Sequence, residues 1–510
     1  MELIVAKNSL EAETLKLLSN DTERVDRNSV EGSNTGAKIK CGIIYVRPSG
    51  MRSTGFDSFA KSLVTLLESH AELPREQQIL DIESPHTSPI ASIPDIKSLL
   101  LLPEDTTEEI RVFYDSKVDT IIAVVDERGR SKQEIHYVGA ELQKFGNRKL
   151  GAVVLCVSRK DLEPRTGKIT GLPTHLPLGI LQQLNALQGN RNFIAPNLPS
   201  LDSVEKKLMI VGAHISHAGS GAAASCPSVA ALVGSVDEAL MRYTGSARLQ
   251  ATLKTTSWKE NPESSKLKYE VQSQIVDLES MMRERIEAWI ARRGRTQAPH
   301  IVFYRHSNHS SSEGVVENEI NAIQAVCKLF TWEDGNATTF DYVLVNKNAY
   351  VFSPYRNAPS EESSAKAAYE FNIADSAGQA GYKYQYYVQD TTSNYLTSEQ
   401  CKNLTRRLNL NFQQKNAKLA IALPVHYAQK LAKRMYEYFL FATTNQYDQL
   451  SSVQRRLGFS DEKTYQNDQE MADMMNEYLL GYGVVKAREE PQPDRKNLWM
   501  PQLDDKMFYL

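Results

Sequence analysis

Cysteines are few in this sequence, and no long apolar segment is present. The five cysteines are scattered and odd in number, and none forms a C-x-x-C pair: Cys41, Cys156, Cys226, Cys327 and Cys401. This pattern argues against a disulfide framework or a cysteine zinc site and favours reduced thiols, as in the cytoplasm or nucleus. No apolar run approaches the roughly 20 residues of a membrane helix, and the first residues are too acidic for a signal peptide. We therefore expect no membrane association.

A basic surplus is also absent. Lysine and arginine total 59 and aspartate and glutamate total 62, which leaves a formal net charge of -3 over 510 residues. Proteins dedicated to nucleic acids usually carry a clear positive surplus. Any nucleic acid would therefore have to bind in a local basic channel. The length predicts two or three domains.

Apolar patterning predicts a flexible leader followed by an α/β domain. Residues 1–38 end in a polar stretch with no apolar period and are expected to be flexible. Residues 39–200 alternate apolar strands with helical patterns such as Phe56–Glu68, which is typical of a parallel, Rossmann-like α/β domain. The expected strands are Cys41–Val46, Thr120–Val125 and Ala152–Val157.

Residues 201–510 follow a proline-bearing boundary and have a different order of elements. Three strands come first, then a long helix that Gly294 would end, then a strand and a second helix. The expected strands are Lys207–Ile215, Ser228–Val236, Leu249–Thr255 and Ile301–Tyr304; the first helix has Ile275, Leu278, Met282, Ile286 and Trp289 on its apolar side, and the second spans Val315–Phe330. This order is typical of the opening of a ribonuclease-H-like fold.

A further helix beginning near His426 has one basic side. Tyr427, Leu431 and Met435 fall on the apolar side of this helix. The opposite side holds Lys430, Lys433 and Arg434. Such a face is most often solvated, and the alternative is a helix that faces phosphate.

Motifs along both parts of the chain resemble Argonaute proteins, in the same order. KIKCGIIYVRPSG and RKLGAVVLCVSR resemble strands of the MID domain. LMIVGAHISHAG, PSVAALVGSVDEAL, DLESMMRERI, HIVFYRHSN and IALPVHYAQ resemble successive segments of the PIWI domain, and the final MFYL resembles the terminus that the family buries between the two. The resemblance implies a Rossmann-like MID domain at 39–200 and a ribonuclease-H-like PIWI domain at 201–510, with no counterpart of the amino-terminal and PAZ domains of long Argonautes.

The resemblance also implies that this lobe does not cut nucleic acid. Active family members hold two Mg²⁺ ions largely with carboxylates, which suit this hard cation. Carried onto this sequence, the four catalytic positions are His214, Ser273 (expected on the long helix), His306 and Gln429, and none is a carboxylate. We therefore expect no nuclease activity and no cofactor.

Two alternatives remain open at these positions. The neighbouring acids that could substitute are Asp237, Asp277 and Glu313, each with a simpler structural role. The histidines that could bind Zn²⁺ instead are His214, His217, His306 and His309. If their two strands are adjacent, as in the ribonuclease-H fold, His214 and His306 could come close. Zinc suits imidazole but needs three or four convergent ligands, and histidines three apart on a strand point to opposite faces. Polar side chains tolerated at a decayed site are the simpler interpretation.

The pocket for a guide's 5′ phosphate is altered as well. Family members use tyrosine, lysine and glutamine from MID and an arginine from PIWI, because cations form charge-assisted bonds with phosphate. The altered MID positions are Gln143, Leu155, Gln183 and Leu187, and the retained PIWI arginine is Arg434. The other candidate nucleic-acid contacts are Tyr137, Lys144, Arg128, Arg130, Lys132, Lys430 and Lys433. We expect weaker and less phosphate-selective binding than in an intact Argonaute.

Two functions fit this sequence. The first is a nuclease-dead Argonaute-like protein that binds small RNA or a guide–target duplex and acts in RNA silencing through protein partners, in the cytoplasm or nucleus. The second is a protein-interaction scaffold with little nucleic-acid affinity, which the pI of about 6.4 and the altered pocket favour. A zinc-dependent protein is a remote third.

Overall fold

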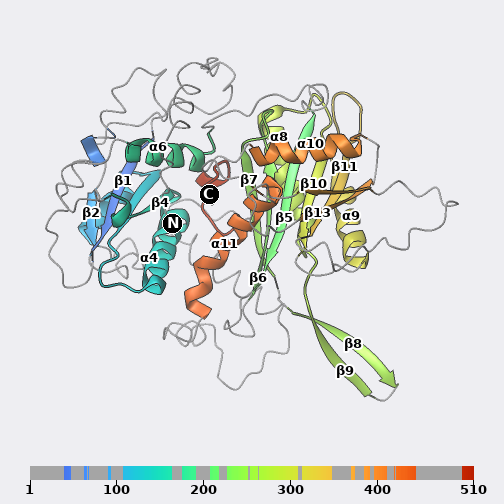
Figure 1. The fold of residues 1–510 in the computed structure, drawn as a ribbon, viewed down its shortest axis with the longest axis horizontal. Coiled ribbons are helices and arrows are strands. Elements are labelled where there is room, and N and C mark those ends of the chain that lie inside the picture. The colour runs from blue at the N-terminus through green and yellow to red at the C-terminus, as the bar shows by residue number, and fades with distance from the viewer. Residues whose placement is uncertain are drawn as a thin grey trace.

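A computed structural model describes much of the chain as two sheets with surrounding helices (Figure 1). The described residues are 39–47, 63–65, 67, 90–93, 107–162, 175–190, 207–217, 227–250, 253–261, 264–307, 313–346, 369–373, 384–390, 395–410, 419, 421–443 and 497–510. The expected leader, 1–38, lies outside these ranges. None of the helices within them is both long and apolar enough to span a membrane.

The first sheet is parallel, as the sequence predicted. Its strand order is β2–β1–β3–β4, with bounds β1 Cys41–Val46, β2 Ile90–Ile93, β3 Thr120–Val125 and β4 Val153–Ser158. All residues of β1 and β3 are buried, which is typical of parallel strands. The accompanying helices are α3 Glu108–Asp115, α4 Lys132–Phe145, the π-helical turn η4 Gly146–Leu150, α5 Arg159–Leu162 and α6 His175–Leu187. Strand β2 was not predicted.

The second sheet is mixed and has seven strands. Their order is β12–β13–β11–β10–β5–β6–β7, and β5, β10 and β11 are parallel neighbours at its centre. The bounds are β5 Leu208–Ser216, β6 Ser228–Ser235, β7 Tyr243–Gln250, β10 His300–Ser307, β11 Thr339–Asn346, β12 Tyr369–Ile373 and β13 Tyr384–Asp390. Its helices are α8 Leu278–Arg293, α9 Glu313–Cys327, α10 Ser398–Leu410 and α11 Leu423–Thr443.

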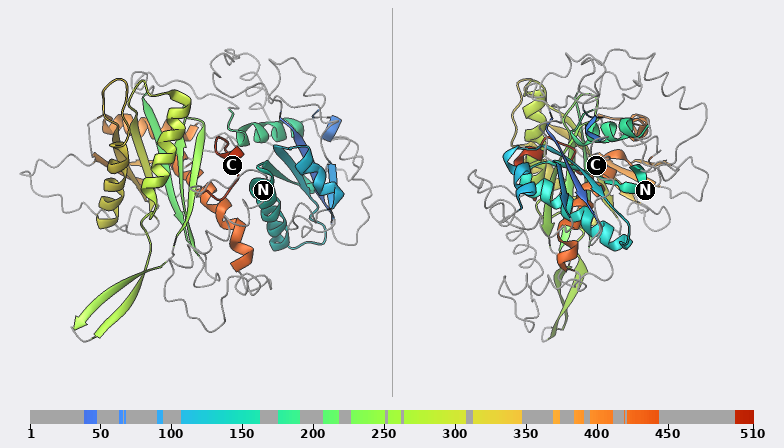
Figure 2. Two further views of the ribbon diagram at one scale, coloured as in Figure 1. Left: turned by 180° about the vertical axis from the view of Figure 1, so that it is seen from behind. Right: turned by 90° about the vertical axis from the view of Figure 1, so that its left-hand side faces the viewer.

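The prediction of a third strand at Leu249–Thr255 was wrong. Strand β7 ends at Gln250, and the chain then forms a separate antiparallel hairpin of β8 (Leu253–Asn261) and β9 (Ser264–Val271). Figures 1 and 2 show this hairpin projecting from the rest of the protein. The predicted segment combined the last residues of β7 with the first residues of β8, because residues that favour strands occur at the end of one and the start of the other.

Helix α11 and the C-terminal segment Asn497–Leu510 lie between the two sheets (Figure 1). Met500 N donates to Asn147 O in η4 at 3.0 Å, and the Tyr509 hydroxyl donates to the Tyr243 carbonyl of β7 at 3.0 Å. The terminus is therefore buried against both parts of the fold, as the resemblance implied.

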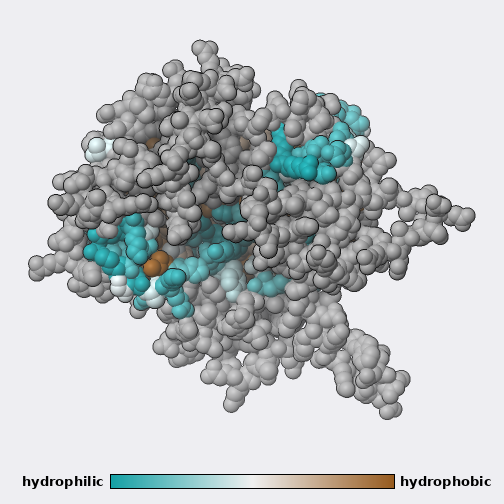
Figure 3. All heavy atoms as spheres, viewed as in Figure 1, coloured by the Kyte–Doolittle hydropathy of each residue, from teal (hydrophilic) through white to brown (hydrophobic). Residues whose placement is uncertain are grey.

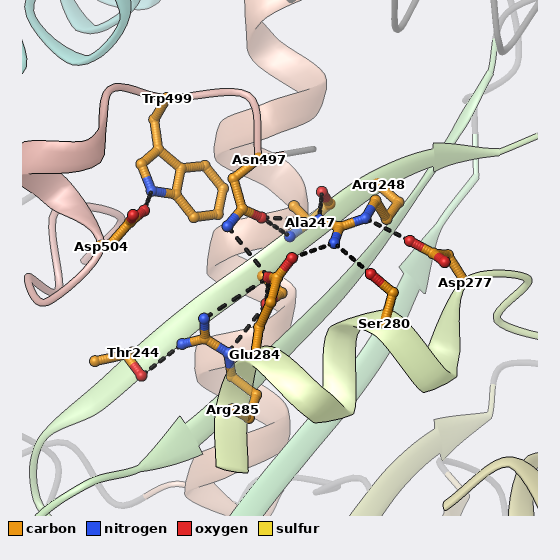
Figure 4. A network of polar contacts seen from close by, with 11 residues as sticks. Thr244, Ala247, Arg248, Asp277, Ser280, Glu284, Arg285, Asn497, Trp499 and Asp504 are labelled. Atoms are coloured by element: carbon orange, nitrogen blue, oxygen red, sulfur yellow. Dashed lines mark hydrogen bonds and ion pairs between the residues drawn. The ribbon is translucent and has the colours of Figure 1, made fainter. Parts of the chain in front are cut away.

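A polar network anchors the start of this C-terminal segment (Figure 4). Arg248 of β7 donates to Asn497 Oδ1 at 2.9 Å and to Asp277 Oδ2 at 2.7 Å, and it also pairs with Glu284 of α8. Arg248 is buried, so these partners compensate its lost hydration. The network joins β7, α8 and the C-terminal segment.

Gly212 of β5 marks a close approach that a side chain would block. A Cβ atom there would lie 2.1 Å from the Pro424 carbonyl oxygen at the start of α11. We expect Gly212→Ala to lower the free energy of unfolding by about 1–3 kcal/mol, measured by urea denaturation, because α11 must shift away from the sheet. Gly139→Ala in α4, where a Cβ meets nothing within 4 Å, is the matched control and should not destabilise the protein. Equal unfolding curves for both variants would contradict this close packing.

Candidate functional site

Three of the four expected catalytic positions meet at one point. Strands β5 and β10 are parallel neighbours, with Ala213 opposite Arg305, so the next residue of each strand is also close. His214 Nδ1 and His306 Nδ1 lie 3.0 Å apart, and Gln429 Nε2 of α11 lies 3.3 Å from His306 Nδ1. The expectation that the two histidines could come close is confirmed.

Both histidines of this pair are buried. His214 is 8% exposed and His306 is 4% exposed. Burial, with the nearby His306 and Arg305, holds the pKa of His214 well below its ordinary value. A neutral pair can share one hydrogen bond between its two Nδ1 atoms, with one ring donating and the other accepting.

The fourth position, Ser273, lies in the segment between β9 and α8. Its expected place on the helix was wrong, because α8 begins at Leu278. The Ser273 carbonyl accepts a hydrogen bond from Arg305 Nη2 at 2.6 Å, and Glu319 of α9 pairs with Arg305 at 3.0 Å and accepts from Ile275 N at 3.0 Å. This buried ion pair holds the segment beside β10. Ile275 also lies before α8, although its position matched the apolar period predicted for this helix.

These side chains do not fit a pair of Mg²⁺ ions. Magnesium prefers carboxylate oxygen, whereas the converging groups are two imidazoles and an amide. Of the acids that could substitute, Asp237 Oδ1 accepts from two backbone amides, at 2.8 and 2.9 Å, and Asp277 pairs with Arg248. The side chain of Glu313 lies outside the described residues. Both described acids therefore have structural partners.

The larger zinc alternative is not assembled in the part of the chain that the structure describes. No group of three or more His, Cys, Asp or Glu side chains is placed there to hold a metal ion. His217 Nδ1 lies 2.9 Å from Ser228 Oγ, which gives this ring a structural contact. His309 lies outside the described residues.

A group of cations gathers where α4 and η4 meet α11. This basic cluster consists of Lys144, Arg148, Lys149, Lys430 and Arg434. Burial and the charge of Lys144 lower the pKa of Lys149 to about 8, and burial with Arg434 and Lys433 lowers the pKa of Lys430 to about 8. Lowered lysine pKa values report cations held close together and partly out of water.

Contacts between α4, η4 and α11 hold the two sides of the basic cluster together. The Tyr438 hydroxyl donates to Asn147 Oδ1 at 2.7 Å, and His136 Nε2 lies 3.0 Å from Glu437 Oε1. Burial raises the pKa of the Tyr438 phenol, and Arg434 and Arg148 both oppose that rise, so both guanidinium groups act on this one ring. Figure 3 shows hydrophilic residues gathered near the centre of this face of the molecule, in the region where Figure 1 places α11.

The helical pattern predicted that Arg434 lies on an exposed basic side of α11, and this prediction was wrong. It is 8% exposed and donates to the Phe508 carbonyl of the C-terminal segment at 3.3 Å. Lys433 is exposed and Lys430 is partly buried. The apolar side, with Tyr427, Leu431 and Met435, is buried as expected.

The loop after β3 forms an internal network with two of the candidate arginines. Asp126 is buried and accepts from Arg128 at 2.7 Å, from Arg159 at 2.8 Å and from the Tyr45 hydroxyl at 2.7 Å. Although burial opposes ionisation, these bonds hold the pKa of Asp126 below its ordinary value. Arg130 donates to the Arg47 carbonyl at 2.9 Å. Sequence reasoning missed Asp126 and Arg159.

The remaining candidates have mixed environments. Lys132 is exposed at the first position of α4, within the capping box that Ser131 and Glu134 form. Tyr137 is partly buried against hydrophobic residues of the first sheet and its helices. Lys144 pairs with Glu141 at 3.5 Å. Of the altered pocket positions, Leu155 and Leu187 are core residues, and Gln143 and Gln183 are partly exposed. Arg148 and Lys149, which sequence reasoning missed, stand in RKLG, a motif used only to recognise the following strand.

Comparisons with known proteins agree with this architecture. Residues 130–439 match the family model described as the Piwi domain. Protein argonaute 18 of rice (Oryza sativa subsp. japonica) is 24% identical over 345 residues, a match that covers 64% of this chain and 29% of that protein.

Two solved structures have the same fold. Kluyveromyces polysporus Argonaute with a guide RNA has a TM-score of 0.60 and 15% identity, covering 93% of this chain and 51% of that one. The C-terminal lobe of a budding yeast Argonaute has a TM-score of 0.59 and 14% identity, covering 93% and 86%. The chain thus spans 29% of the rice protein and about half of the Kluyveromyces chain. The predicted Rossmann-like and ribonuclease-H-like fold is confirmed.

Proposed function

Because this chain belongs to the Piwi domain family, we propose that it binds the 5′ end of a small RNA and does not cut the paired target. It acts in RNA silencing through protein partners, in the cytoplasm or nucleus. The observation that carries the RNA-binding half is the basic cluster between α4, η4 and α11.

A terminal phosphate fits this cluster chemically. A phosphate monoester carries nearly two negative charges at neutral pH and has three strong acceptor oxygens. Burial and neighbouring cations lower the pKa values of Lys149 and Lys430, so a bound dianion would relieve the repulsion among the cations and favour the charged form of both lysines. Arg434 adds a guanidinium group anchored by the C-terminal segment. Cations missing at the expected pocket positions are thus replaced by others nearby.

Absence of cutting follows from the chemistry at His214, His306 and Gln429. Two imidazoles and an amide offer no negative charge, whereas two-metal hydrolysis needs carboxylates to gather its Mg²⁺ ions. RNA held by this lobe would remain intact.

Equilibrium binding of a labelled RNA of about 21 nucleotides tests the proposal directly. We expect the 5′-phosphorylated form to bind at least about tenfold more tightly than the 5′-hydroxyl form, because charge-assisted bonds contribute about 1.5–3 kcal/mol each. Equal affinities would contradict binding at the cluster. Weak binding of both forms that disappears with moderate salt would favour the scaffold function, which the net charge of -3 supports.

The affinity for 5′-phosphorylated RNA is expected to depend on pH. Lys149 and Lys430, with pKa values of about 8, are mostly charged at pH 7 and mostly neutral at pH 9. The affinity should therefore fall as pH rises, by up to about tenfold for each lysine that must regain its proton. The phosphate itself stays a dianion over this range, since its second pKa is about 6. Fluorescence anisotropy at several pH values measures the effect, and a flat profile would contradict it.

A further inference from the structure

We propose that one face of the β8–β9 hairpin binds the backbone of an RNA duplex, formed by the small RNA and its paired target. This inference rests on the proposed function for the identity of the ligand, and it adds a contact surface outside the basic cluster. It is carried by the register of the hairpin, by the charges that this register brings together and by the place where the hairpin joins the sheet.

The register of the hairpin places three lysines and a tryptophan on one face. Trp258 pairs directly with Lys266, and Thr256 pairs directly with Lys268. Residues that pair directly across an antiparallel ribbon lie on the same face, and so do residues two apart on one strand. The lysine face defined in this way consists of Lys254, Thr256, Trp258, Lys266, Lys268 and Glu270.

The lysine face is positive in a chain whose net charge is negative. Three lysines against one glutamate leave this face a formal charge of +2, whereas the whole chain carries -3. Lys266 and Lys268 lie roughly 7 Å apart along β9, so they can reach separate phosphates of one RNA strand. Lysine binds phosphate as a point charge without reading the base sequence. This chemistry suits a partner recognised by its backbone, such as a duplex whose sequence changes with the guide.

The hairpin joins the seven-stranded sheet at the edge that holds His214 and His306. Strand β7 ends at Gln250, which pairs with Ser228 at the start of β6, and β6 begins beside the last residues of β5. His214 lies two residues before the end of β5, and His306 lies one residue before the end of β10. A paired target that lies over the altered catalytic positions would therefore pass close to the base of the hairpin.

The base of the hairpin is fixed to the sheet. Gln250 is buried, and its Nε2 donates to the Gln274 carbonyl at 3.0 Å while its Oε1 accepts from Val276 N at 3.3 Å. Arg305 of β10 donates to the Ser273 carbonyl just after β9. Figures 1 and 2 show the rest of the hairpin projecting away from the two sheets. Because β8 has nine residues, it extends over roughly 30 Å and can follow a duplex beyond the sheet.

Fluorescence anisotropy of labelled 5′-phosphorylated RNA, alone and paired with its complement, tests the proposal on the full-length chain. We expect Lys266→Gln with Lys268→Gln to lower the affinity for the duplex by about tenfold. The slope of log affinity against log salt concentration should fall by about 2, because two phosphate contacts are lost. The affinity for the single strand should change by no more than about twofold, since the basic cluster holds its 5′ phosphate.

Lys259→Gln is the matched control within the hairpin. Lys259 pairs with Ser265 on the opposite face, so its loss should change the affinity for the duplex by no more than about twofold. Trp258 supplies an independent measurement, because the other three tryptophans, Trp289, Trp332 and Trp499, are buried. We expect the duplex to change the tryptophan fluorescence of the original chain, and Trp258→Leu to remove this change.

Circular dichroism of each variant establishes that it is folded. Unchanged duplex affinity and salt dependence in the double lysine variant would overturn the proposal. An equal loss for duplex and single strand, or the same loss in Lys259→Gln, would overturn it as well. A 5′-hydroxyl duplex should show the same effect of the hairpin substitutions, since the lysine face needs no 5′ phosphate. Equal affinities for 5′-phosphorylated and 5′-hydroxyl RNA would therefore contradict the proposed function alone.

Discussion

Replacing Lys149 and Lys430 together by methionine is expected to lower the affinity for 5′-phosphorylated RNA by about 100-fold or more. Each lysine can donate charge-assisted bonds to phosphate, and about 1.4 kcal/mol corresponds to a tenfold change in affinity. Methionine keeps most of the volume of the lysine stem, so packing between η4 and α11 should change little. Electrophoretic or anisotropy titrations of the variant and the original chain measure the effect.

Lys433→Met on the same helix is the matched control. Its side chain is 73% exposed and pairs loosely with Glu437 at 3.7 Å, so its loss should change the affinity by no more than about threefold. The double variant should also be no less stable than the original, because it removes two cations from a crowded, partly buried site. If Lys433→Met weakened binding as much as the double variant, the RNA would lie on the outer face of α11 and not in the basic cluster.

No cleavage of a complementary target above background is expected when the RNA-loaded chain is incubated with Mg²⁺ or Mn²⁺. The same four positions also predict a gain of function. Changing His214→Asp, Ser273→Glu, His306→Asp and Gln429→His would introduce three carboxylates and a histidine, the ligand types that the family resemblance implies. We expect this variant to acquire a Mg²⁺-dependent rise in thermal stability, because the ion neutralises carboxylates that repel one another when it is absent.

The matched control keeps the geometry and removes the charge. It carries His214→Asn and His306→Asn, with Ser273→Gln and Gln429→His, and should show no stabilisation by Mg²⁺. Mg²⁺-dependent cleavage by the original chain would overturn the inactivity proposed here. Stabilisation of the original chain by Mg²⁺ that is lost in a His214→Ala variant would contradict the chemical interpretation of the site.

Strands buried on both faces were predictable because their sequences are almost continuously apolar. Both Cys41–Val46 and Thr120–Val125 begin and end where the sequence placed them. The end of α8 at Gly294 was also predictable, because helices commonly end at a glycine. In the structure Gly294 has a φ of 75°, which few other residues adopt. The β8–β9 hairpin was not, because nothing in the apolar pattern separates its first strand from β7.

The sequence predicted the contact between His214 and His306 but not the basic cluster. His214 and His306 could be paired from the sequence because adjacent parallel strands place neighbouring positions together. The basic cluster could not, because Arg148 and Arg434 are far apart in the chain and come together at Tyr438 only where η4 packs against α11. The helical period likewise placed Arg434 on an open face, since it cannot register that the C-terminal segment covers that side. The basic cluster and the burial of Arg434 both depend on contacts between segments that are distant in the sequence.

Sequencing the RNA that remains with the protein after purification from its native cells at moderate salt tests the central claim most directly. If this lobe holds guides without cutting, intact small RNAs of restricted length and with a biased first nucleotide should co-purify, and Lys149→Met with Lys430→Met should remove them. The absence of RNA, or fragments of all lengths that persist in the double variant, would contradict guide binding.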